Sequence, residues 1–140
     1  MEYVCDASDG KTWFRMETEG EALLESESMK HAVEKFFRRE REKTVQTYRP
    51  TSQNFIEQDI GLSAHIKRSM PLFLTLRDRE GNALVTAMLP PGGRSDPSFR
   101  TIIVGPANAD PYAGHGPAIE ALGRHYGLTL ARARCFPYGR

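Results

Sequence analysis

The sequence contains only two cysteines, Cys5 and Cys135, among its 140 residues. Neither belongs to a C-x-x-C pair, so their spacing excludes a zinc ribbon and a thioredoxin-type redox site. They would approach each other only if the first and last strands of the chain paired. The simplest interpretation is a cytoplasmic protein in which both thiols stay reduced and pack as small apolar groups.

Long apolar runs and an excess of charge are also missing. No run approaches the roughly 18 apolar residues that a membrane span requires. The N-terminus, M-E-Y-V-C-D, lacks the basic and apolar regions of a secretory signal. Lys and Arg number 19 against 18 Asp and Glu, a net charge of +1. Proteins that coat nucleic acid or membrane surfaces are usually strongly basic, so neither partner is expected.

The common catalytic and cofactor motifs are absent as well. There is no G-x-G-x-x-G, no G-K-[ST] and no G-x-S-x-G. Ser95, His115 and Asp110 have the residue types of a Ser-His-Asp triad. However, a predicted strand at 101–104 would hold their two loops about 15 Å apart. The sequence therefore predicts no cofactor, no metal and no catalytic residue.

The bulk composition is that of an ordinary globular domain. Hydrophobic residues make up 39% of the chain and charged residues 26%. A chain of this length buries about two-thirds of its unfolded surface, which suffices for one core without metal or disulfide. We expect a single domain over residues 1–140.

Several segments are predicted to form strands. Residues 3–5 and 12–16 flank Asp9-Gly10, which is typical of a tight hairpin turn. Residues 72–76 and 83–88 form a second predicted hairpin, and 101–104 a short apolar strand. Apolar and polar residues alternate over 128–136, which predicts a last strand in the same sheet. They also alternate over 60–67, which favours another strand, although Ile56 and Ile60 four residues apart leave a helix open.

Two segments are predicted to form helices. Thr18 and Glu21 have the spacing of a capping box and begin a long helix that extends to about Thr44. One side of this helix is an apolar stripe formed by Ala22, Ser26, Met29, Val33, Phe36 and Phe37. A short helix is predicted over 118–126, with Pro117 at its first position and Gly127 just past its end.

Because strands cluster instead of alternating with helices, the fold class is predicted to be α+β. The expected architecture is a mostly antiparallel sheet of about five to seven short strands. One long and one short helix would pack on one face of that sheet.

The long predicted helix carries one metal-like pattern. Glu27, His31 and Glu34 have the spacing E-x-x-x-H-x-x-E, which places a partial ligand set on one side of a helix. This side points roughly 130° away from the apolar stripe. Arg38 extends the same row and can pair with Glu34 four residues away. A solvated ion-pair ladder is therefore the preferred interpretation.

The loop over 105–117, G-P-A-N-A-D-P-Y-A-G-H-G-P, is the main candidate site. It leads into a helix N-terminus, where free N–H groups and the helix dipole favour an anion. His115 would act as acid, base or donor, with Asp110 orienting it and Tyr112 touching the ligand. The remaining predicted members are the amide of Gly116 and the counter-charges Arg94 and Arg100. The alternative is a plain structural loop, since prolines and glycines occur wherever a chain turns.

The leading functional hypothesis is a non-catalytic binding or self-associating module. Aromatic residues near the C-terminus need a packing partner, and a homodimer is the commonest soluble assembly. The alternative is a binder or enzyme for a small anionic ligand at the loop around His115. Weak nucleic-acid binding is the third hypothesis.

Overall fold

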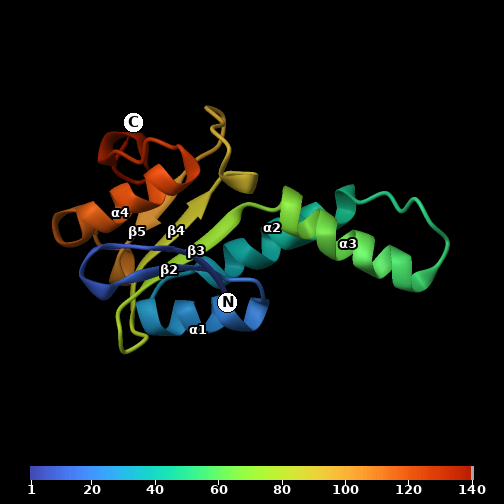
Figure 1. The fold of residues 1–140 in the computed structure, drawn as a ribbon, viewed down its shortest axis with the longest axis horizontal. Helices are drawn as coiled ribbons and strands as arrows, with labels where there is room; N and C mark the ends of the chain where they lie inside the picture. The colour runs from blue at the N-terminus through green and yellow to red at the C-terminus, as the bar shows by residue number, and fades with distance from the viewer. Residues whose placement is uncertain (140) are drawn as a thin grey trace.

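The structure, a computed structural model, describes residues 1–139 and contains one five-stranded antiparallel sheet (Figure 1). The strands lie in chain order, and each one pairs with the next. They are β1 (Glu2–Asp6), β2 (Thr12–Arg15), β3 (Leu72–Arg77), β4 (Ala83–Leu89) and β5 (Ile102–Val104). The α+β class, the antiparallel sheet and both predicted hairpins are confirmed.

Four α-helices accompany the sheet, where two were predicted. Three of them, α1 (Glu19–Met29), α2 (Val33–Thr47) and α3 (Phe55–Ser69), lie between β2 and β3 in the chain, and α4 (Tyr112–Tyr126) follows β5. Within residues 1–139, no helix combines the length and the apolar content that a membrane span requires.

Helices cover both faces of the sheet, so the prediction of helices on one face was wrong. Leu72, Leu74 and Leu76 of β3 belong to a core that includes Ile119 and Leu122 of α4. Phe73 of β3, on the opposite face, belongs to a second core with residues of α1 and α2. β3 is buried on both sides, as near-continuous apolar strands usually are, and each face needs its own covering layer.

The long predicted helix is two helices. The Thr18–Glu21 capping box is present and begins α1. At Lys30 the backbone turns left-handed, with φ 54°, and α2 begins at Val33. Met29 and Val33 are both buried on either side of this break. The break therefore changes the direction of the chain while keeping the apolar stripe in the core.

The segment 60–67 is part of a helix, so the predicted strand was wrong and the alternative left open by Ile56 and Ile60 is correct. Asn54 begins α3 by accepting hydrogen bonds from the backbone N–H groups of Ile56 and Glu57 at 2.9 and 3.2 Å. This local cap, together with packing against α2, outweighs a period-two pattern of only a few residues.

The last predicted strand was also wrong. Residues 132–134 form a short 3₁₀ turn, and only Phe136 bridges to Ile102 of β5. β1 lies at the opposite edge of the sheet, so the first and last segments do not pair. Within the described range both cysteines are free thiols.

Helices α2 and α3 form a hairpin that projects from the body of the protein (Figure 1). We call residues 38–69 the arm. Val33 and Phe37, in the first turns of α2, pack in the core, whereas the outer part of the hairpin extends beyond the sheet. The arm and the domain body therefore offer two separate surfaces.

Candidate functional site

The residues predicted to surround His115 have separate structural roles. Asp110 accepts hydrogen bonds from Tyr112 N at 2.9 Å and from Arg132 Nε at 2.6 Å. The Tyr112 hydroxyl donates to the carbonyl of Leu130 at 2.9 Å. His115 Nδ1 lies 3.2 Å from Lys11 Nζ. Asp110 and Tyr112 are thus brought together at the start of α4, but the bonds of Asp110 go to Arg132 and Tyr112 and none to His115.

The other predicted members lie elsewhere. Gly116 lines a groove along α4 together with Tyr112. Arg100 lies over the Phe136 ring at 4.9 Å and lines a different groove with Ser95, and Arg94 is exposed. Neither groove includes His115. The predicted helix start at Pro117 was wrong, because α4 begins at Tyr112 and contains His115, Gly116 and Pro117. Anion binding near His115 stays a prediction.

A buried carboxylate on the other face of the sheet is the centre of a hydrogen-bond network. Glu25 of α1 has no exposed surface. Its Oε1 accepts from Thr75 Oγ1 at 3.0 Å and from the Arg77 guanidinium at 2.9 Å, and its Oε2 accepts from Thr86 Oγ1 at 2.6 Å. Thr75 and Thr86 are direct partners in the β3–β4 register. The strand pairing therefore sets two hydroxyls side by side beneath one carboxylate.

This network compensates for the cost of burying a charge. A carboxylate removed from water is tolerated when it is paired and its lone pairs accept hydrogen bonds. Arg77 supplies the opposite charge, and its Nε also donates to Thr75 Oγ1 at 3.0 Å. Among the described residues, no buried side-chain nitrogen or oxygen lacks a partner.

His31 extends the network toward the surface. Its Nε2 lies 2.8 Å from Thr86 Oγ1. Because the Thr86 hydroxyl donates its proton to Glu25, its oxygen must accept from His31 Nε2–H. This bonding pattern assigns the neutral tautomer with the proton on Nε2 and a lone pair on Nδ1. The backbone N–H of Val33 makes a long, weak bond to that Nδ1, at 3.4 Å.

Burial lowers the pKa of His31 below its ordinary value, and the negative charge of Glu25 opposes this shift only in part. The imidazole is therefore neutral at pH 7, in agreement with the tautomer assigned from its hydrogen bonds.

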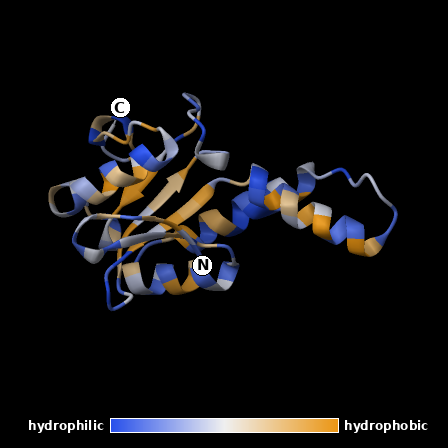
Figure 2. Ribbon diagram, viewed as in Figure 1, coloured by the Kyte–Doolittle hydropathy of each residue, from blue (hydrophilic) through white to orange (hydrophobic). Residues whose placement is uncertain are grey.

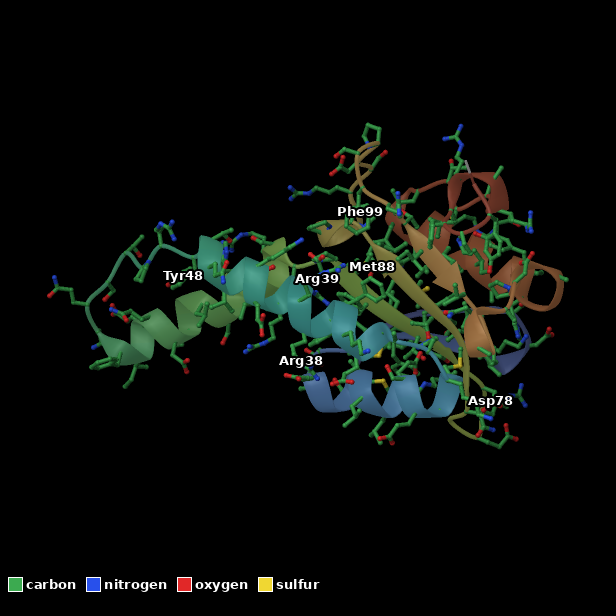
Figure 3. All side chains as sticks on the ribbon, turned by 180° about the vertical axis from the view of Figure 1, so that it is seen from behind. Arg38, Arg39, Tyr48, Asp78, Met88 and Phe99 are labelled. Carbon is green, nitrogen blue, oxygen red and sulfur yellow. The ribbon has the colours of Figure 1, made fainter. Side chains whose placement is uncertain are left out.

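His31 and Thr86 lie in the wall of a pocket of about 100 Å³ at the β5 edge of the sheet. The break between α1 and α2 forms one side, and β4 and β5 form the floor. The remaining lining is mostly apolar and consists of Ala32, Val33, Phe36, Phe73, Ala87, Met88, Ile102, Val104 and Asn108. Met88 is labelled on the sheet in Figure 3. The pocket exists because α2 turns away at residues 30–32 and leaves this part of the sheet open.

The ion-pair ladder predicted for Glu27, His31 and Glu34 is correct only in part. Glu34 pairs with Arg38, as expected, but His31 lies beyond the end of α1 and turns inward to Thr86. The break at Lys30 removes His31 from the helical row. No group of three His, Cys, Asp or Glu side chains gathers as a metal site anywhere in residues 1–139.

Sequence reasoning missed Glu25, although a signal was present. Glu25 lies three residues after Ala22 and four before Met29, both of which are fully buried. At 100° per residue it therefore falls on the apolar stripe of α1. A carboxylate on such a stripe is a candidate for a buried, hydrogen-bonded role.

Comparison with known proteins found no matching protein family, no matching curated protein and no matching solved structure.

The lowered pKa of His31 predicts a pH dependence of stability. Protonation is harder in the folded protein than in the unfolded chain, so the unfolded state binds more protons as the pH falls below about 6.5. The free energy of unfolding should therefore decline as the pH falls through the ordinary histidine value of about 6.5, and level off below the folded pKa.

NMR titration of the imidazole carbons should place the folded pKa of His31 below 6.5. His31→Gln should have a shallower decline of stability with falling pH. His115, whose pKa is also lowered by burial and by Lys11, continues to contribute in this variant. A His31 pKa at or above the ordinary value would contradict the buried, neutral assignment.

Proposed function

We propose that the protein is a binding domain for a small, mainly apolar molecule that carries one hydrogen-bond donor. The observation that supports this proposal is the composition of the His31 pocket, which combines an apolar lining with a polar end formed by His31 and Thr86. Pockets of this kind, apolar with a few placed polar groups, are typical of ligand sites.

The hydrogen bonds of the network define which group the ligand must bring. The Thr86 hydroxyl gives its only proton to Glu25, and the Nε2 proton of His31 goes to Thr86. What remains for a ligand are lone pairs, one on Thr86 Oγ1 and one on His31 Nδ1, the latter only weakly engaged by Val33 N–H. Both are acceptors, so the matching ligand group is a hydroxyl or an N–H donor.

Size restricts the ligand further. The pocket holds about 100 Å³. An apolar cavity of about 150 Å³ accommodates a benzene ring. The occupant is therefore a short aliphatic chain or the edge of a ring, and any larger part of the ligand extends outward past the α1–α2 break.

Binding, and not covalent chemistry, is the role that these groups favour. The hydroxyl of Thr86 already donates to the Glu25 carboxylate, which is paired with Arg77. The His31 imidazole donates to this hydroxyl and does not accept its proton. This polarity is opposite to that of a histidine which activates a nucleophile. The network is suited to hold fixed acceptors in place.

Two isomers test the proposal, since butan-1-ol and diethyl ether have the same atoms but only the alcohol has a donor. Butan-1-ol should shift the amide signals of residues 31–33, 102 and 104 in a saturable manner in NMR titrations. Diethyl ether should bind at least about tenfold more weakly, because it leaves the buried acceptors unpaired.

Ala32→Phe provides the blocking variant, because residue 32 is exposed yet lines the pocket. It should abolish the butan-1-ol shifts, whereas Ala113→Phe, at an exposed position on α4, should leave them intact. Equal binding of both isomers, no saturation, or shifts that survive Ala32→Phe would refute the proposal.

A further inference from the structure

The outer end of α3 carries an apolar group of side chains that the pocket does not explain. Phe55, Ile56 and Ile60 are 87%, 72% and 65% exposed. They lie in the first turns of α3, at the outer end of the arm, where Figure 2 shows hydrophobic colour far from the domain body. Grouped exposed side chains of this size usually mark an interaction surface.

The inner side of α3 is already occupied by α2. His65 Nε2 lies 2.8 Å from Thr47 Oγ1 and 3.1 Å from the carbonyl of Thr44, and its ring packs against Tyr48. Figure 3 shows Tyr48 at the outer end of α2, beside α3. These contacts fix which side of α3 faces α2 and which side faces away.

The outward side of α3 is a continuous stripe. At 100° per residue, Ile56, Ile60, Ser63 and Lys67 fall within a narrow sector opposite His65. At the inner end of this sector Lys67 pairs with Glu2 of β1 at 2.6 Å, so the uncovered part is the outer one, with Ile56 and Ile60. Within residues 1–139, no side chain of α3 is fully buried. Since most of the stability of a helix in a protein comes from packing its apolar side, a 15-residue helix with this exposure lacks a covering partner.

We propose that this partner is α3 of a second copy of the chain, packed antiparallel about a two-fold axis near residue 62. The charges of α3 support this occupant, because Glu57 lies in its first turn and Arg68 in its last, whereas Lys67 pairs with Glu2 of its own chain. An antiparallel pair brings the acidic end of each helix against the basic end of the other. The surface is thus complementary to itself, as a two-fold interface requires.

The register of this pair follows from the stripe. Around residue 62, Ile60 of one copy meets Ala64 of the other, and Ser63 supplies the small residue at the crossing. Glu57 and Arg68 lie on the same flank of the stripe, so each Glu57 faces Arg68 of the second copy. Two arms joined in this way place the four helices in a row, α2–α3–α3–α2, in which Ile56 and Ile60 are buried between the two copies of α3.

Ile60→Asp is the direct test, measured by sedimentation velocity on the full chain. The wild-type protein should sediment as a dimer, and Ile60→Asp should raise the dissociation constant at least about thirtyfold. The circular dichroism spectrum of monomeric Ile60→Asp should match that of the wild-type protein, because Ile60 is exposed in the single chain. Leu24→Asp is the matched control, an exposed apolar residue on α1 outside the arm. It should stay dimeric.

Charge reversal tests the antiparallel register. Glu57→Arg and Arg68→Glu should each weaken the dimer about fivefold, and the double variant should recover the wild-type dissociation constant. A monomeric wild type, a dimer that survives Ile60→Asp, dissociation by Leu24→Asp, or a double variant weaker than both singles would overturn the proposal. Since the pocket lies on the domain body, the butan-1-ol titration is independent of these outcomes.

Discussion

Replacing Glu25 with alanine is expected to lower the free energy of unfolding by about 3–5 kcal/mol. The variant leaves the Arg77 charge without its buried partner and removes the acceptor of two buried hydroxyls, Thr75 and Thr86. Unsatisfied buried polar groups are among the few single changes that destabilise a domain this strongly. Urea unfolding followed by circular dichroism measures the loss.

Two companion variants keep this prediction testable. Glu25→Gln retains a carbonyl acceptor for one hydroxyl and should lose less stability than Glu25→Ala, so it reports on the network even if alanine prevents folding. Glu27→Ala changes an exposed carboxylate on the same helix and should leave the unfolding midpoint unchanged. If Glu25→Ala and Glu27→Ala unfold at the same urea concentration, the buried network does not stabilise the fold.

The second large effect is expected on the opposite face of the sheet, where Trp13→Ala should lower the free energy of unfolding by about 3–5 kcal/mol. Trp13 of β2 has no exposed surface and packs in the core with α4. Its indole Nε1 also donates to the carbonyl of Ala118 at 2.8 Å, which ties the helix to the sheet. The substitution opens a cavity in the core and removes the hydrogen bond to Ala118. Thermal unfolding followed by circular dichroism measures the loss of stability.

Trp13→Phe separates the two contributions. It keeps an aromatic ring in the core but removes the indole N–H, so the expected loss is about 1–2 kcal/mol. If Trp13→Phe is as damaging as Trp13→Ala, the hydrogen bond to Ala118 and not the packing volume dominates. A stable Trp13→Ala variant would contradict the central place of this side chain in the core.

Local signals in the sequence were sufficient for the parts of the fold that depend on neighbouring residues. The turn at Asp9-Gly10 joins β1 and β2, and both residues have positive φ angles there. The capping box at Thr18 and Glu21 begins α1, and Gly127 ends α4 in the left-handed conformation. In each case the deciding hydrogen bonds or dihedral angles lie within a few residues.

Other elements could not be predicted because distant contacts decided them. The alternation over 60–67 is compatible with a strand, but α2 packs against this segment and makes it a helix. The alternation over 128–136 would suit a strand, but β5 is only three residues long and Phe136 alone bridges to it. The break between α1 and α2 could not be predicted, because the residue in the left-handed conformation is Lys30 and no glycine or proline lies there.

The candidate sites likewise combine features that local sequence predicts with features that only distant contacts decide. The α+β class, the two hairpins and the start of α1 could be predicted from the sequence, whereas Glu25 was missed. Only the tertiary structure decided that Thr75 and Thr86, 50 and 61 residues from Glu25, lie beneath its carboxylate. It also decided that His31 turns inward to complete a pocket. The physical reason is that strand register and helix direction join residues whose separation in the chain carries no local pattern.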